Sequence, residues 1–353
     1  MRALAIILVL IWHYFNCQVN APQTLFVKGL KFFTFFTWSG VDLFFILSGF
    51  LIGRILITHK KSPHYFKTFY VRRIFRIFPA YYLIIITFMF ALSAGLSEKF
   101  SWLMANPFPL YTYLLYLQNF WMSAGEFGPH WLAITWSLAV EEQFYLVLPL
   151  FVFLVKDKYL PWIFICGICS APFFRYDFNN LGSYVLLPAR IDALLLGALI
   201  AYYHLKGELE KWLKGQQKFL YAVFVLSLCG VFICGAQPNG ESIGGIWIHS
   251  LLALFYGSLF TITLMLKETS VFSKFLSSKP LAFIAKISFM VYLTHQLFSG
   301  LMHRLILNQD PQLTNTNDVL VTLFALLITF LFSAISYRFF EKPFLNFSKR
   351  FNY

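Results

Sequence analysis

The chain has 353 residues, of which 59% are hydrophobic and only 12% are charged. Soluble domains carry about 25% charged residues, so this composition excludes an ordinary soluble globular protein. The net charge of +13 could indicate nucleic-acid binding, but in a chain of repeated apolar segments we attribute it to basic loops on the cytoplasmic side of a membrane. We therefore predict an all-α integral membrane protein, with membrane lipid and not nucleic acid as its surroundings.

About ten apolar segments follow one another along the chain, each close to the length that crosses a bilayer. The predicted spans are residues 2–19, 36–57, 78–96, 135–155, 159–174, 186–204, 219–236, 246–266, 281–302 and 318–339. The tyrosine-rich segment 109–121 is too short to cross and is expected to be half-buried or interfacial. No polar stretch is long enough for a separate soluble domain, so residues 1–353 are predicted to form one polytopic domain.

The distribution of basic residues predicts how the chain is oriented. With ten spans and a cytoplasmic N-terminus, the outer loops hold only Lys28, Lys31, Lys99, Arg175 and Arg304, and the inner loops and the tail hold most of the other basic residues. Counting 109–121 as a span would reverse every later loop and remove this asymmetry. Both termini are therefore predicted to lie in the cytoplasm.

The first segment carries an arginine, Arg2, and a histidine, His13, eleven residues apart. At about 100° per residue both lie near one helix face, with a rise of roughly 16 Å between them. We expect Arg2 at the cytoplasmic surface and His13 near the middle of the membrane. The segment also resembles a cleavable signal peptide, but a histidine beside Trp12 favours a permanent helix.

The fourth predicted span contains two adjacent carboxylates, Glu141 and Glu142, at a depth close to that of His13. Because neighbouring side chains on a helix point about 100° apart, both cannot face one partner. We expect one of them to orient His13, with Glu142 preferred to Glu141, and the other to pair with a cation such as Arg190.

Other ionisable or small residues lie inside predicted spans, where charges usually mark function or pair with each other. Asp42, Arg190, Asp192 and His295 reach similar outer-half depths, and Ser48 and Gly49 lie deeper on the second span. Arg190 and Asp192 could form an internal ion pair, and a structural role is favoured for His295. Gly49 is expected to allow close helix packing.

A basic layer is predicted at the cytoplasmic side. It consists of Arg2, Arg54, Arg72, Arg73, Arg76, Lys286 and Arg338. Topology and snorkelling explain any single member, but the cluster also suits the phosphates of a cytoplasmic donor. Arg72 and Arg76 are four residues apart and are expected to share a face.

The final stretch YRFFEKPF is expected to end a helix before Pro343. The cysteines are not expected to form a metal site.

Taken together, these motifs resemble the acyltransferase-3 family of membrane O-acyltransferases. The matching stretches, in order, are RALAIILVLIWH, GVDLFFILSGFLI, FYVRRIFRIFPAYYL, WSLAVEEQFYLVLP, ARIDALLLGALIA, SFMVYLTHQ and YRFFEKPF. The resemblance implies a ten-helix bundle in the bacterial inner membrane. It implies transfer of an acyl group, usually acetyl, from acetyl-CoA as a donor that is not tightly bound. The acceptor would be a hydroxyl of a carbohydrate, such as lipopolysaccharide O-antigen, capsule, exopolysaccharide or a lipid-linked precursor.

The resemblance also assigns roles to individual residues. Arg2 and His13 match the first-helix pair, and Arg72, Arg73 and Arg76 match the basic motif. Trp136, Ser137, Glu141 and Glu142 match the WSL-EE motif. Family members usually have a short segment with Asp-Gly before the arginine, whereas this sequence begins at Met1. Some members also carry a fused extracytoplasmic domain, so a second step here would require a partner in glycan synthesis.

These residues suggest a mechanism in which His13 is a general base and the arginines hold the donor phosphates. The sequence leaves open whether an acyl-enzyme forms on His13 or Ser48 or whether transfer is direct. The main alternative is a permease for a small anionic solute, although inverted repeats are not visible in the sequence. A membrane-bound acyltransferase of the other large type is a third possibility, but its histidine lies further along the chain.

Overall fold

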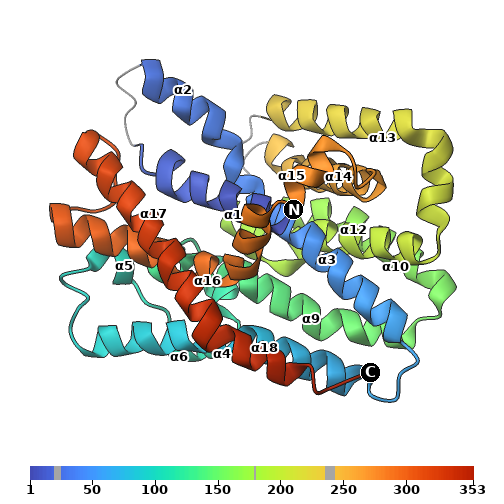
Figure 1. Cartoon of the computed structure of the whole chain (residues 1–353), viewed down its shortest axis with the longest axis horizontal. Coiled ribbons are helices and arrows are strands. Elements are labelled where there is room, and N and C mark those ends of the chain that lie inside the picture. The colour runs from blue at the N-terminus through green and yellow to red at the C-terminus, as the bar shows by residue number, and fades with distance from the viewer. Residues whose placement is uncertain (20–24, 179, 235–242) are drawn as a thin grey trace.

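The computed structural model describes residues 1–19, 25–178, 180–234 and 243–353, and within these ranges the secondary structure is helical without strands. The helices form an elongated bundle (Figure 1). They are α1 Arg2–Ile11, η1 Trp12–Asn16, α2 Leu25–Thr34, η2 Phe35–Ser39, α3 Gly40–His59, α4 Tyr65–Ser93, α5 Ser101–Met104, α6 Leu110–Leu114, α7 Gln118–Met122, α8 His130–Ala133, α9 Trp136–Leu154, η3 Asp157–Tyr159, α10 Leu160–Asp177, α11 Asn180–Val185, α12 Leu187–Leu205, α13 Glu208–Ile233, α14 Ile243–Met265, α15 Val271–Leu276, α16 Lys279–Met302, η4 His303–Leu307, α17 Thr316–Ser336, η5 Tyr337–Glu341 and α18 Lys342–Ser348.

Among the described residues, eight helical stretches are long and apolar enough to cross a membrane. They correspond to eight of the predicted spans. The remaining two predicted spans are also helical, but the helix Arg2–Asn16 is shorter and α10 is less apolar. Segment 109–121 forms two five-residue helices, α6 and α7, with half their residues buried, which confirms that it is not a spanning helix.

Two helices extend well beyond the apolar runs that predicted them. α4 begins at Tyr65, so the basic stretch before residue 78 is helical and Pro79 lies inside the helix. The expectation that a helix ends before Pro343 is wrong. The path of α17 continues through the π-turn η5 into α18, where Pro343 occupies one of the first two positions. A proline is tolerated there because the π-turn just before it already interrupts the regular hydrogen-bond pattern of the helix.

Loops that a membrane-crossing path would place on one side lie together. At one end, Lys60 pairs with Asp157 at 2.7 Å, and the ring of Tyr353 stacks on His59. At the other end, the Leu313 N–H donates to the Gln18 carbonyl at 2.9 Å, and Arg304 donates to the Lys99 carbonyl. We call these the C-terminal end and the opposite end of the bundle. The loops can alternate between these two ends only if residues 94–135 do not add a membrane crossing.

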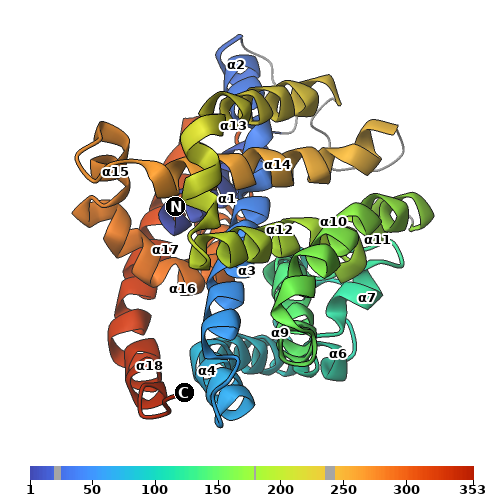
Figure 2. The same ribbon diagram turned by 90° about the vertical axis from the view of Figure 1, so that its right-hand side faces the viewer.

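The helix α3 runs through the middle of the bundle and contacts α1, α9, α12 and α14 (Figures 1 and 2). Its contact with α12 is very close. A Cβ atom at Gly49 would lie 1.9 Å from the Leu194 carbonyl oxygen, and one at Gly197 would lie 2.2 Å from the Ile46 carbonyl oxygen. The predicted close approach at Gly49 is therefore confirmed, and side-chain-free positions on both helices make it possible.

Candidate functional site

His13 lies at a π-turn that continues the first helix. Its Nδ1 is 3.0 Å from the Val9 carbonyl oxygen, which can only accept, so Nδ1 carries the proton. Among the described residues, Nε2 has no hydrogen-bond partner. Single π-turns are often found at functional sites. Here the turn leaves a histidine with one nitrogen fixed by the backbone and the other nitrogen free.

The ring of His295, on α16, lies against His13 with 4.9 Å between ring centroids. Its Nδ1 donates to the Tyr292 carbonyl at 2.7 Å, and the Tyr14 hydroxyl donates to the His295 carbonyl. The His295 side chain is fully buried, and within the described part of the chain its Nε2 has no hydrogen-bond partner. The structure thus brings together two histidines that are far apart in the sequence.

His13 opens onto a large cavity of about 1030 Å³, which we call the outer cavity. Its described lining is mainly aromatic and carboxamide side chains: Trp12, His13, Gln18, Trp38, Trp102, Phe127, His130, Ile134, Trp136, Tyr184, Tyr292, Gln296, Gln309 and Asp310, among others. A cavity of this size that combines aromatic walls with polar side chains is typical of a binding site for a small organic molecule.

A second, narrower cavity of about 100 Å³, the inner cavity, lies beyond Val41 and Tyr292. Arg2, Arg73 and Arg76 line it together with apolar side chains. Within the described part of the chain, these three guanidinium groups have no hydrogen bond or ion pair. Unpaired arginines in a cavity favour an anionic ligand, because their planar donors match phosphate and carboxylate oxygens.

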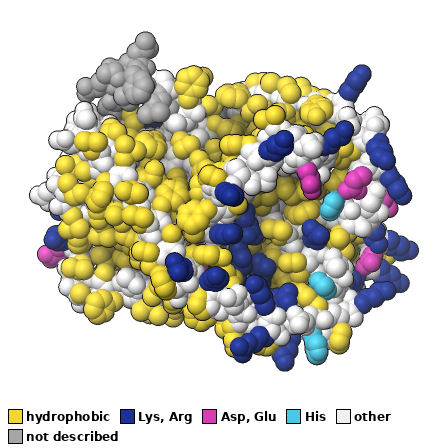
Figure 3. Space-filling view, viewed as in Figure 1, with side chains coloured by type: hydrophobic (Ala, Val, Ile, Leu, Met, Phe, Trp, Pro, Cys, Tyr) yellow, Lys and Arg dark blue, Asp and Glu magenta, His cyan; other side chains and the backbone are white. Residues whose placement is uncertain are grey.

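The inner cavity also contains a chain of hydrogen bonds from α3 to α9. The Tyr145 hydroxyl donates to the Glu141 carboxylate at 3.0 Å and is hydrogen-bonded to Ser48. Lys286 and Glu341 lie in an adjoining hollow that shares Arg2 and Arg76. Figure 3 shows Lys and Arg side chains gathered in a band across this face, beside a surface that is otherwise largely hydrophobic.

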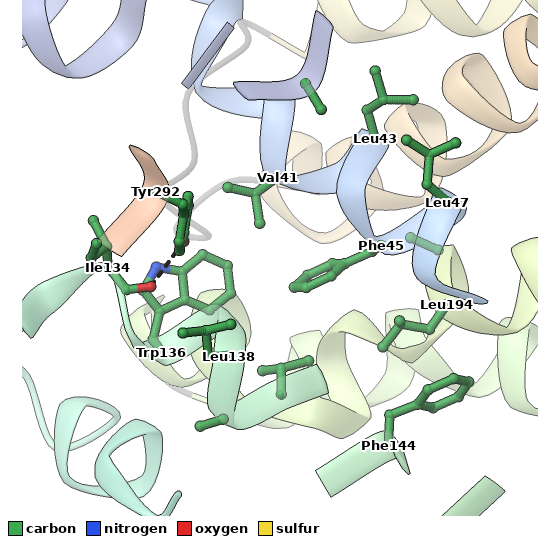
Figure 4. Packing of buried hydrophobic residues seen from close by; sticks show 14 of the residues in the cluster. Val41, Leu43, Phe45, Leu47, Ile134, Trp136, Leu138, Phe144, Leu194 and Tyr292 are labelled. Atoms are coloured by element: carbon green, nitrogen blue, oxygen red, sulfur yellow. Dashed lines mark hydrogen bonds between the residues drawn. The ribbon is translucent and has the colours of Figure 1, made fainter. Parts of the chain in front are cut away.

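Val41 and Tyr292 line both cavities and form the wall between them. The Tyr292 hydroxyl donates to the Ile134 carbonyl at 2.9 Å (Figure 4). The same hydroxyl lies 2.6 Å from the Ser137 hydroxyl. Trp136 faces the outer cavity, and Ser137 faces the inner cavity. The WSL motif therefore meets α16 at the boundary of the two cavities.

The expected pairing of Glu142 or Glu141 with His13 is not what the structure has. Glu141 shares the inner cavity with Arg2, whereas His13 lies in the outer cavity. One buried Glu142 oxygen has no hydrogen-bond partner among the residues that the structure describes. The depth estimate failed because it placed Arg2 at the membrane surface. The N-terminus lies near the middle of the bundle (Figure 1), which moves Arg2 to the level of Glu141 and His13 towards the opposite end.

Arg72 does not share the inner cavity with Arg76. Its Nε donates to the Phe351 carbonyl at 2.8 Å, and its guanidinium lies over the Tyr353 ring. Arg73, three residues before Arg76, lines the cavity instead. Arg54 and Arg338 are exposed and line none of the cavities described here.

The predicted pair of Arg190 with Asp192 is wrong, because each has another partner. Arg190 pairs with Asp42 at 2.7 Å, and Asp192 pairs with Arg175 at 3.0 Å. All four side chains are buried, and Arg190 also contacts His249. Arg190 and Asp192 are two positions apart on α12, so their side chains point about 200° apart around the helix and meet different neighbours.

Sequence reasoning did not identify several residues that contribute to the site. Tyr145 follows Glu141 by four residues, a spacing that places both on one helix face. Tyr292 and Gln296 flank His295 in the MVYLTHQ stretch. Arg175, which the predicted spans place in an outer loop, is buried and pairs with Asp192 behind the site. The sequence around His249 does not indicate its contact with Arg190, because it shows only a histidine in an apolar run.

A family model described as an acyltransferase domain matches residues 1–338. The chain is 28% identical over 378 residues to O-acetyltransferase OatA of Staphylococcus aureus strains NCTC 8325 / PS 47, COL and MRSA252. Each alignment covers 97% of this chain and 56% of the relative, so the chain spans about half the length of these relatives. No solved structure matches the chain significantly. The match over almost the whole sequence shows that the chain belongs to the acyltransferase-3 family.

Proposed function

We propose that this protein is a membrane O-acetyltransferase that moves an acetyl group from acetyl-CoA to a hydroxyl of a carbohydrate. The proposal rests on one observation: the inner and outer cavities adjoin each other and share the wall formed by Val41 and Tyr292. An arginine-lined cavity suits an anionic donor, and an aromatic cavity with a free histidine nitrogen suits a hydroxyl acceptor. The S. aureus relatives named as O-acetyltransferases support the same reaction.

The donor site is formed by Arg2, Arg73 and Arg76. Their unpaired guanidinium groups would hold the phosphates of acetyl-CoA, and the apolar walls of the inner cavity would contact its extended arm. The rise along the first helix from Arg2 to His13 is about 16 Å. An extended thioester arm can bridge that distance, so its acetyl group would reach the wall at Tyr292.

The chemistry begins with removal of a proton from the acceptor hydroxyl by the free Nε2 of His13. The Val9 carbonyl holds the tautomer that leaves this nitrogen unprotonated, so that it can accept a proton. The acceptor oxygen then attacks the thioester carbonyl carbon, the C–S bond breaks, and coenzyme A leaves as a thiolate that takes up the proton. Glu141 would act at the donor side, where it accepts a hydrogen bond from Tyr145, whose hydroxyl is also bonded to Ser48.

The acceptor is proposed to be a cell-surface polysaccharide or its lipid-linked precursor, with the protein in the bacterial inner membrane and both termini in the cytoplasm. The C-terminal end carries the basic loops, which supports this orientation. The outer cavity then faces away from the cytoplasm. Partners in glycan synthesis would supply and collect the acceptor.

The test uses labelled acetyl-CoA and membranes that contain the wild type, His13→Ala or the control His64→Ala at matched expression. His64 is exposed in the loop before α4. Label should enter glycan with the wild type and the control and fall at least about a hundredfold with His13→Ala, the loss usual for a general base. Equal label in all three would remove His13 from the chemistry. Uptake of a solute without any transfer would favour the permease.

A further inference from the structure

Gln296 is a buried polar side chain that faces the outer cavity without a partner. It lies on α16 directly after His295 and is only 8% exposed. Among the described residues, its carboxamide has no hydrogen bond. Buried carboxamides are nearly always hydrogen-bonded, so a free one that faces a cavity indicates a ligand with matching donors and acceptors.

Three other glutamines, Gln18, Gln309 and Gln312, line this cavity, and the first two are already engaged by the protein. Gln18 donates to the Ser299 hydroxyl at 2.9 Å and to the His13 carbonyl at 3.1 Å. Gln309 donates to the Asp318 carboxylate at 2.6 Å. These two glutamines shape the cavity, whereas the carboxamide of Gln296 remains available to a bound molecule.

The charges around the outer cavity differ sharply from those around the inner cavity. Its described lining includes no lysine or arginine, and its acidic residue is Asp310. Arg190 lies behind Trp136 and Tyr184, but its charge is paired with Asp42. An anionic group bound here would have no free cation to compensate its desolvation.

We propose that the outer cavity selects an uncharged sugar residue, with Gln296 hydrogen-bonding a hydroxyl or acetamido group beside His13. The aromatic wall would pack against the apolar face of the sugar ring. A sugar that carries a carboxylate or phosphate at the same position would be rejected. This inference rests on the proposed function, because it assigns the acceptor of that reaction.

The experiment measures binding without acetyl-CoA, so that it does not depend on transfer. The purified full chain in lipid nanodiscs is titrated with methyl β-glucoside or with methyl β-glucuronide, which differ in one carboxylate. Trp12, Trp38, Trp102 and Trp136 line the cavity, so tryptophan fluorescence reports occupancy. The variants are Gln296→Ala and Gln296→Lys, with the exposed Gln216→Ala as the control.

The wild type and Gln216→Ala should bind the glucoside at least about tenfold more tightly than the glucuronide. Gln296→Ala should weaken glucoside binding about tenfold, and Gln296→Lys should shift the preference towards the glucuronide. Equal binding of both sugars, no binding of either, or unchanged binding in Gln296→Ala would overturn the inference. Selective, Gln296-dependent binding without any acetyl transfer would instead contradict the proposed function and leave the sugar site in place.

Discussion

Tyr292 is held by Ile134 and Ser137 at the boundary between two cavities, with its hydroxyl 2.9 Å from the Ile134 carbonyl oxygen. The same residue offers its own carbonyl to His295, whose ring packs on His13. One turn of α16 therefore connects the wall between the cavities with the histidine pair. In the proposed reaction, this turn of α16 would have to admit the thioester of the donor and keep water out.

The first prediction concerns that wall. Tyr292→Phe removes both hydrogen bonds of the hydroxyl and should loosen the boundary, so that water from the outer cavity reaches the thioester. Release of coenzyme A without acceptor should rise several-fold relative to transfer. The control is Tyr256→Phe, because Tyr256 is equally buried and bonded to Ser39 but lines neither cavity. An unchanged ratio of release to transfer would show that Tyr292 does not seal the site.

The second prediction separates the arginines of α4. Arg73→Ala and Arg76→Ala should each raise the KM for acetyl-CoA about tenfold or more, because each removes a charged donor to the phosphates. Arg72→Ala should leave this KM within about twofold, since Arg72 bonds the C-terminal residues. The measurement is initial rate against acetyl-CoA concentration. A larger effect of Arg72→Ala than of Arg76→Ala would contradict the donor site.

The third prediction concerns the contact of α3 with α12. Gly49→Ala places a Cβ against the Leu194 backbone and should destabilise the protein by about 1–3 kcal/mol. Gly215→Ala is the control, because no atom lies within 4 Å of a Cβ at that position. Thermal unfolding of the purified proteins in detergent checks both variants. If Gly49→Ala and the wild type had equal unfolding midpoints, α3 and α12 could move apart without a loss of stability.

The fourth prediction concerns the buried ion pairs. Arg190→Met leaves Asp42 buried without its cation and should lower stability by about 3–5 kcal/mol, while the double variant Asp42→Asn/Arg190→Met should recover part of that loss. Asp157→Asn is the matched control, since it breaks a largely exposed pair with Lys60 and should cost about 1 kcal/mol or less. The unfolding midpoints of the four proteins decide between these outcomes.

The exposed pair of Asp157 and Lys60 is also sensitive to pH. The hydrogen bond from Lys60 lowers the pKa of Asp157, so the contribution of the pair is present above the usual carboxyl range and is lost as the pH falls through it. Because the pair is exposed, this effect should be small. Its measurement is the unfolding midpoint of the wild type and Asp157→Asn as a function of pH.

The sequence by itself determined the all-helical membrane class, the approximate positions of the helices and the residues that carry the family resemblance. These features are local, because the length of an apolar segment and the spacing of a motif depend only on residues that are close in the sequence. It also singled out His13, Arg2, Arg73, Arg76 and Glu141, which line one or other of the two adjoining cavities.

Only the tertiary structure decided which of these residues meet. Arg190 faces Asp42, Glu141 faces Tyr145, and His13 faces His295. Partner choice depends on where each helix begins along the bundle axis and on how it is rotated, and neither follows from a residue's position in its own helix. Because the first helix begins deeper in the bundle than expected, Glu141 shares a cavity with Arg2, and His13 lies against His295.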